Sequence, residues 1–325
     1  MKLNKIVSAH MNDVPMSRGL IALRNLMQIM KAIWKWRISY LFLAPFFILF
    51  AIFIIAPTLT SIGLSFTYYN ILEPARFTGW SNFKMLFVDD DIFITALVNT
   101  LYFALVTGPI GYILAFFFAW LIHQIPKRLR PYYTTVFYVP SLTSGVAMSV
   151  VWLVLFANDS YGYLNTFLMN YGLIDEPVQW LADVKLIMPV IIVISLWMSF
   201  GTSFLAFLAG FETINTELYE AGKIDGIRSR FQELWWITIP SMKPQMLFGA
   251  VLAVVGAFKV GEISSAVAGF PSPLYAGHTI VLHLHDYAVL RYEMGYAAAI
   301  SVVLFVLIYV LGKLCFRIFA SKGEL

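Results

Sequence analysis

Apolar residues are gathered into six long runs that alternate with shorter polar connections. A helix that crosses the hydrocarbon core of a bilayer needs about 20 consecutive, mostly apolar residues. Each run meets that length, so the pattern predicts six transmembrane helices. The predicted spans are residues 38–66, 94–122, 132–156, 186–211, 245–270 and 295–319.

Composition agrees with this pattern. Of the 325 residues, 60% are hydrophobic and only 12% are charged, whereas a soluble globular protein has about 25% charged residues. Lipid is therefore the solvent for most of the chain, and the predicted fold class is an all-α membrane protein. Its parts are a cytosolic N-terminal segment (1–37), a transmembrane domain (38–319) and a cytosolic tail (320–325). Residues 20–36 within the first part are expected to form a cytosolic or interfacial helix.

The distribution of basic residues sets the predicted orientation. Most lysines and arginines lie in the N-terminal segment, in the tail and in the connections after spans two and four. The three opposite connections are poor in basic residues and rich in acidic ones. Because cytosolic loops carry the excess of positive charge, both termini and the 212–244 connection are predicted to be cytosolic. In the opposite connection after span three, residues 164–171 have the apolar spacing of a short surface helix.

The connection between spans four and five contains an amphipathic segment, "ELYEAGKIDGIRSRFQELWWITIP" at 217–240. Its apolar residues recur every three or four positions, which is typical of a helix with one apolar face. Asp225 and Gly226 are a predicted helix end, and Ser229 with Gln232 has the form of a capping box that starts a second helix. Pro240 is expected to end that helix. The apolar face, which we expect to anchor the segment to its own bundle, comprises Leu218, Ala221, Ile224, Ile227, Phe231 and Leu234.

Two interpretations of this segment remain open. It could lie on lipid headgroups, or it could fit a groove in another protein. A helix on a lipid surface usually has a basic polar face, but here Glu220 and Asp225 alternate with lysine and arginine. Mixed charge favours a protein groove. Gly222 and Gly226, four residues apart, would allow another backbone to approach.

Lys259 and Glu262 are the ionisable residues within predicted span five. Charged side chains inside a membrane usually face a partner or a cavity. Three residues apart on one helix, they would share a face. They are expected either to pair, with each other or with a second subunit, or to line a path for a solute.

Aromatic rings in spans four to six could stack on sugar rings or simply pack between helices. Trp197, Phe204 and Phe258 are the candidates, with Ser199 as a polar contact. The stretch "HTIVLHLHD" at 278–286 offers histidines two residues apart and a carboxylate, but a fourth metal ligand is not evident. Solvated or interfacial histidines are therefore expected rather than a metal site.

The residues "EAGKIDG" followed by "ITIP" resemble the EAA loop of the permease subunits of type I ABC importers. Glu220, Ala221, Gly222, Gly226 and Pro240 occupy the positions of that motif. Gly222 stands where alanine is usual, and the spacer to Pro240 is one residue longer than the common form. The 161–183 connection and "MGYAAAIS" at 294–301 are similar to the carbohydrate-uptake branch of these binding-protein-dependent permeases.

The resemblance implies a function and a set of partners. The first helix of the loop would be a coupling helix in a cleft of a separate ATPase subunit, with Asp225 at its end. The chain would form half of a sugar pore in the bacterial cytoplasmic (inner) membrane. Its partners would be a second permease subunit, an ATPase dimer that uses ATP and Mg²⁺, an extracytoplasmic solute-binding protein and membrane lipid, without nucleic acid.

The motif search agrees with a chain that has no catalytic site or cofactor of its own. The sequence contains no P-loop pattern, no G-x-S-x-G and no H-E-x-x-H. An ion-coupled secondary transporter remains an alternative, although no inverted repeat is evident. An intramembrane enzyme that uses the histidines is a further alternative.

Overall fold

The protein is described here from a computed structural model, which places residues 31, 34–143 and 145–319. The chain divides into two compact units, Met1–Thr60 and Ser61–Leu325, and each is described separately. The expected helix at 20–36 lies almost wholly outside the described residues. Residue 144 and the tail at 320–325 also lie outside them.

The first unit contains α3 (Arg37–Phe50), the π-helical turn η1 (Ala51–Ile55) and the beginning of α4 (Ala56–Leu64). Together they make a continuous apolar helix, Arg37–Leu64, that is long enough to cross a bilayer. None of the α3 or η1 residues is buried. A helix that is apolar on all sides and exposed on all sides fits a lipid environment.

In the second unit, three further segments have the length and composition of membrane spans: α6 (Asp91–Gln124), Val184–Glu212, and Met294–Ile318 within α18 (Met294–Phe319). The Val184–Glu212 segment comprises α10 (Val184–Trp197) and α11 (Thr202–Glu212). Two bent helix pairs could each be one more span, so the described residues hold four to six spans. The chain is thus a mostly helical, multi-pass membrane protein.

Predicted span three is one of the two bent pairs, and predicted span five is interrupted at a point outside the other pair. Span three consists of α7 (Arg130–Leu142) and α8 (Gly145–Leu155), which meet at 95°. The other pair, Arg230–Ser241 and Lys243–Phe258, meets at 82°. Predicted span five is not continuous either, because α15 (Lys243–Phe258) and α16 (Glu262–Ala268) are separate helices.

The break between α15 and α16 coincides with a close contact to a later segment of the chain. A Cβ atom at Gly261 would come within 2.7 Å of Val281 Cγ1, so only glycine lets the chain pass this close to its neighbour. Thr279 Oγ1 donates a hydrogen bond to the carbonyl of Val260 at 2.8 Å. That bond satisfies a backbone group that the broken helix leaves without an intrahelical partner.

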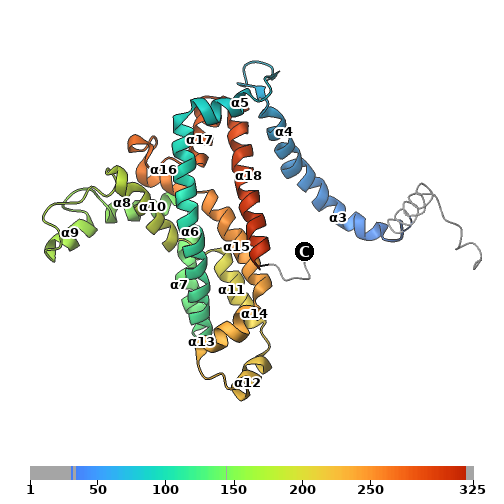
Figure 1. The fold of residues 1–325 in the computed structure, drawn as a ribbon, viewed down its shortest axis with the longest axis vertical. Coiled ribbons are helices and arrows are strands. Elements are labelled where there is room, and N and C mark those ends of the chain that lie inside the picture. The colour runs from blue at the N-terminus through green and yellow to red at the C-terminus, as the bar shows by residue number, and fades with distance from the viewer. Residues whose placement is uncertain (1–30, 32–33, 144, 320–325) are drawn as a thin grey trace, which may run out of the picture. The chain divides into compact units, whose positions relative to one another are not determined.

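The bundle is organised around α6. Helices α10, α11 and α15 pack on α6, and α15 also packs on α18 (Figure 1). Phe204, Phe207 and Phe211 of α11 are fully or almost fully buried among residues of α6 and α15. Gly249 admits the ring of Phe207, since a Cβ there would lie 2.5 Å from Phe207 Cζ.

Short elements join the long helices at the two ends of the second unit (Figure 1). One end carries α12 (Thr216–Ile224), α13 (Arg230–Glu233), η3 (Leu234–Thr238) and α14 (Ile239–Ser241). The other end carries β1 (Thr67–Tyr68), β2 (Arg76–Phe77), α5 (Ser81–Lys84), η2 (Met85–Asp89), α17 (Ile280–His285) and η5 (Asp286–Leu290). The strands pair antiparallel, with Thr67 opposite Phe77.

Two remaining elements are α9 (Tyr163–Asn170) and η4 (Pro273–Tyr275). Helix α9 confirms the predicted short helix between spans three and four. Asn165, which is fully buried, fixes it: its Nδ2 donates to the carbonyls of Ala157, Asp159 and Val178 at 3.0–3.1 Å.

The histidine stretch differs in part from its prediction. His283 and His285 lie in helix α17, and His285 is exposed as expected, but His278 and His283 are only 2% and 1% exposed. They are core residues and not solvated ones. The two ring nitrogens of His283 lie within hydrogen-bond distance of Asp90 and His278, whereas Nδ1 of His278 is buried without a hydrogen-bond partner among the described residues. No group of three metal-ligating side chains is found among the residues that the structure describes.

Candidate functional site

The segment 212–244, which we call the elbow, begins with helix α12. The side chain of Asn215 caps this helix by accepting a hydrogen bond from the Glu217 amide at 3.1 Å. The helix ends at Ile224, and Gly226 follows with φ +95°, a conformation that favours glycine. The amide of Ile227 donates to the carbonyl of Gly222 at 2.9 Å, which closes the turn. The predicted helix end at Asp225 and Gly226 is thus confirmed.

The second half of the elbow confirms two predictions. Ser229 and Gln232 form the predicted capping box at the start of α13. The helix ends at Ser241, one residue after Pro240, as predicted for this proline. The π turn η3 precedes the proline: the amide of Ile239 donates to the carbonyl of Leu234, five residues back. This wider hydrogen-bond spacing accommodates a residue without an N–H group.

Gly222 allows close approach, but to its own chain. It is buried, and a Cβ there would lie 2.7 Å from Ile237 Cδ1 and 3.1 Å from Ile227 Cδ1. Tyr219 adds a second link between α12 and η3, with its hydroxyl 2.9 Å from Thr238 Oγ1. Burial raises the pKa of Tyr219. The expectation that Gly222 and Gly226 form one open glycine face is therefore wrong, since one is buried and the other lies beyond the helix.

The outer surface of the elbow is exposed. Glu220, Ala221 and Asp225 are all exposed on α12 and its end. We expected the apolar face to pack on the bundle. It does so only in part, because Ile224 is 87% exposed and Phe231 is 62% exposed. Only parts of it, such as Ile227 and Leu234, are half-buried. An apolar face beside alternating charges is thus available to a partner.

A cavity of ≈ 480 Å³ lies beside α12. Glu220 and Lys223 line it together with residues from the connection after α6. In that connection Arg130 forms an ion pair with Glu212, at the end of α11, and donates to the carbonyl of His123 at 2.7 Å. The ring of His123 stacks on Phe211. These contacts join the elbow to the ends of α6 and α7.

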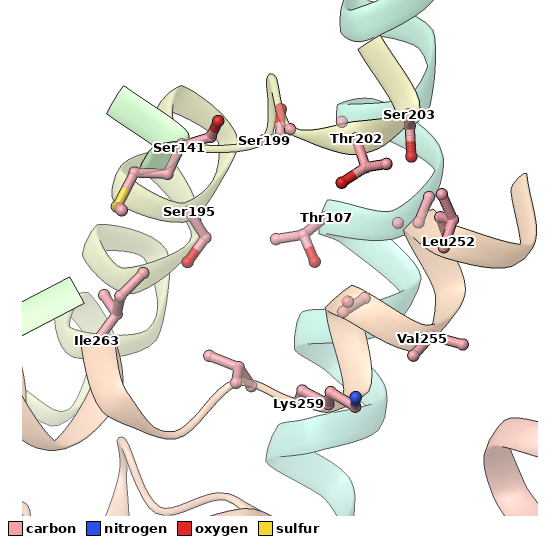
Figure 2. Close-up of a pocket in the computed structure, with 18 of the residues that line it drawn as sticks. Thr107, Ser141, Ser195, Ser199, Thr202, Ser203, Leu252, Val255, Lys259 and Ile263 are labelled. Carbon is pink, nitrogen blue, oxygen red and sulfur yellow. The ribbon is translucent and has the colours of Figure 1, made fainter. Parts of the chain in front are cut away.

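A second cavity, of ≈ 560 Å³, lies between α6, α7, α11, α15 and the residues around α16. We call it the central cavity (Figure 2). Three residues of the predicted solute path line it: Ser199, Lys259 and Glu262. Phe204 and Phe258 do not, because they are 0% and 2% exposed and fill the core. Trp197 is also absent from the lining; its ring lies 5.3 Å from that of Trp152.

Hydroxyl groups provide most of the polar lining. Ser199 donates to the carbonyl of Leu196 at 2.6 Å, Thr107 to Phe103 at 2.8 Å, Ser141 to Tyr138 at 2.7 Å and Ser203 to Gly249 at 3.2 Å. Sequence reasoning missed Thr107, Ser141 and Ser203. Single hydroxyls in apolar helices are common interhelical contacts. Only the folded bundle shows that these converge.

Lys259 and Glu262 do not share a helical face. Lys259 directly follows α15 and Glu262 begins α16, so the break separates them. Among the ion pairs between described residues, none joins the two. The expected mutual pair is therefore not formed, because each residue lies at a different helix end.

The comparisons with known proteins agree with this architecture. Residues 107–322 match the family described as "Binding-protein-dependent transport system inner membrane component". The chain is 31% identical to the probable ABC transporter permease protein YesP of Bacillus subtilis, over 86% of this chain and 89% of that protein. It is 30% identical to AraP of the same organism, a permease of an arabinooligosaccharide transport system, over 88% and 90% of the two chains.

Solved structures give the same result. A bacterial ABC transporter for the import of the acidic polysaccharide alginate matches with a TM-score of 0.72 and 26% identity, covering 90% of this chain and 99% of that one. A second structure of an alginate ABC transporter, in complex with a periplasmic protein bound to alginate pentasaccharide, also matches with a TM-score of 0.72 at 25% identity over 90% and 98% of the two chains. The chain belongs to the binding-protein-dependent ABC transporter permeases, and its relatives include sugar-transport permeases.

Proposed function

We propose that this chain is the permease subunit of an ATP-driven sugar or oligosaccharide importer in the bacterial cytoplasmic membrane. The elbow would receive motion from a separate ATPase, and the central cavity would form part of the solute path. ATP and Mg²⁺ would be bound by the ATPase dimer, not by this chain.

One observation carries this proposal: Glu220, which lines the cavity beside α12, and Asp225, at the end of the helix, are both exposed, while the helix itself is fixed to the bundle. This attachment depends on buried Gly222 and on the contact between Tyr219 and Thr238. A rigid link to the bundle and exposed charges suit an element that transmits force. The bend between Ser241 and Lys243 would carry that motion into α15.

The relatives support the choice of solute and partners. AraP is named for arabinooligosaccharides and the solved transporter for alginate, so an oligosaccharide is the proposed solute class. The complex with a periplasmic protein supports an extracytoplasmic binding protein as a partner. A second permease subunit would complete the pore.

The proposal is tested with the complete importer in proteoliposomes, by measuring ATP-driven uptake and co-purification of the ATPase. Glu220→Arg should reduce uptake at least about tenfold, because a reversed charge at the docking surface costs several kcal/mol. Insertion and the amount of permease should be unchanged. Glu176→Arg is the matched control, since Glu176 is also exposed but lies far along the chain after α9. Normal uptake by the Glu220→Arg importer would exclude the proposed coupling.

A further inference from the structure

The two ionisable residues at the break between α15 and α16 are held in different ways. Glu262 Oε1 accepts a hydrogen bond from the Val146 amide at 3.3 Å. Its carboxylate lies against Gly145, the first residue of α8, where an added Cβ would be 3.1 Å from Glu262 Cδ. Free amides and the helix dipole favour a negative charge at such an end. The charge of Glu262 is thus stabilised within this chain.

Lys259 has a different environment. Its side chain is exposed at the central cavity (Figure 2), and none of the ion pairs between described residues includes it. An ammonium group at membrane depth is unfavourable unless it faces water or an anion. Glu262 is bound at α8 and, among the described residues, does not form an ion pair with Lys259. The positive charge of Lys259 is therefore available to a solute in the cavity.

The hydroxyls of the lining complete the chemistry. Thr107, Ser141, Ser199 and Ser203 each use their single hydrogen in a bond to a backbone carbonyl. Toward the cavity these four therefore act as acceptors. Ser195, which also lines the cavity, is the exception: its hydroxyl has no hydrogen-bond partner among the described residues and can donate one bond, which is neutral and cannot balance the charge of a carboxylate. Sugar hydroxyls can donate to the four acceptors, but a carboxylate has only acceptor oxygens. A carboxylate needs a donor such as the three N–H groups of Lys259.

We propose that the central cavity selects oligosaccharides that contain uronic acid units. In this proposal, which rests on the function proposed above, Lys259 binds the carboxylate and the hydroxyl lining binds the sugar hydroxyls. A single lysine matches the single charge of a carboxylate. Phosphate or sulfate groups are more often bound by the planar fork of arginine, and arginine is not among the cavity residues that the structure describes.

Direct binding tests this assignment without the selectivity of the binding protein. The complete complex of both permeases and the ATPase is placed in nanodiscs without nucleotide. Dissociation constants are then measured for digalacturonate and for its dimethyl ester, which has the same hydroxyls and no charge. Dimannuronate and its dimethyl ester form a second pair that controls for sugar stereochemistry. The variants are Lys259→Gln, Lys259→Arg and, as a control, Lys185→Gln at the exposed start of α10.

We expect the wild-type complex to bind at least one acid about tenfold or more tightly than its ester. Lys259→Gln should remove this preference without weakening ester binding, while Lys259→Arg should keep it and Lys185→Gln should resemble the wild type. Equal loss of acid and ester binding in Lys259→Gln would overturn the proposal and indicate that Lys259 pairs with the second permease. Ester binding without acid binding would overturn it and leave the importer function intact. Binding of neither pair would overturn it as well, and ATP-driven uptake then decides separately whether the chain serves an importer.

Discussion

His283 Nε2 lies 3.0 Å from Asp90 Oδ2, and this contact joins α17 to the first turn of α6. The same carboxylate oxygen accepts from the hydroxyl of Tyr296 on α18 at 2.7 Å. The other oxygen caps α6 through the Phe93 amide at 2.8 Å. One aspartate thus holds three helices together at the end of the bundle opposite the elbow.

The first prediction concerns the charge of Asp90. Burial raises the pKa of this carboxyl. The hydrogen bonds from His283, Tyr296 and the Phe93 amide, together with the charge of His283, lower the pKa by more than burial raises it, so the pKa lies below its usual range. Asp90→Asn should destabilise the protein by about 2 kcal/mol, because hydrogen bonds to a charged acceptor contribute about 1.5–3 kcal/mol. Thermal unfolding in nanodiscs would measure the change.

The neighbouring Asp91→Asn is the matched control, since Asp91 is exposed and its side chain makes no hydrogen bond among the described residues. It should unfold within about 0.5 kcal/mol of the wild type. Equal melting temperatures for the Asp90 and Asp91 variants would contradict the role assigned to the cluster.

The second prediction concerns acid sensitivity at His278. Its Nε2 lies 3.2 Å from His283 Nδ1, and burial, followed by the charge of His283, lowers the pKa of His278 to about 4. The unfolded chain binds this proton near pH 6.5 and the folded chain only near pH 4. The free energy of unfolding should therefore decrease as the pH falls from about 6.5 to 4, by up to about 1.4 kcal/mol per pH unit.

Melting temperatures measured between pH 7.5 and 4.5 check this expectation. His278→Gln should flatten the decrease, because glutamine does not titrate. His285→Gln, at an exposed histidine two residues after His283, should leave the curve as it is. The idea fails if both variants retain the same slope as the wild type.

These buried histidines also show where sequence reasoning reaches its limit. Local signals predicted the elbow well, since the end of α12 at Gly226 and the capping box at Ser229 depend on neighbouring residues. The burial of His283 beside Asp90 depends instead on residues that lie far apart in the chain.

The break of predicted span five also involves a contact between residues that are distant in the sequence. It arises where Gly261 passes Val281, a contact between segments that the hydrophobic pattern of either one does not reveal. The hydroxyls of the central cavity likewise came from helices whose patterns look ordinary. The number of apolar runs could be read from the sequence, whereas the interruptions that shape the cavity required the fold.

The third prediction concerns the turn of the elbow. Gly226 has φ +95° and nothing within 4 Å of an added Cβ, so backbone strain and not a clash opposes other residues there. Gly226→Val should strain the turn by about 1–2 kcal/mol and rotate α12 away from its position. ATP-driven uptake should fall several-fold, with normal membrane insertion.

Gly226→Asn is the informative comparison, because asparagine tolerates positive φ better than other residues with a side chain. It should restore most of the uptake that valine removes. If asparagine and valine impair uptake equally, the side chain rather than the turn is responsible, and the docking face of α12 must extend over Gly226.

The fourth prediction tests the central cavity by filling it. Gly256 lines the cavity on α15, is exposed, and has no atom within 4 Å of an added Cβ. Gly256→Leu should therefore fold normally, and replacing a helical glycine should even favour the helix by up to about 1 kcal/mol. Its side chain would project into the space proposed for the solute. Uptake by the complete importer should fall at least about tenfold while ATP hydrolysis by the complex continues.

Two variants separate cavity filling from a general effect on the helix. Gly256→Ala gives nearly the same gain in helix propensity with little added volume, so uptake should stay close to the wild type. Gly312→Leu places the same side chain at another open glycine, on α18 and outside the cavity lining. If Gly256→Leu transports as well as Gly312→Leu, the solute does not pass this part of α15, and the central cavity would have to be a space between helices rather than a path.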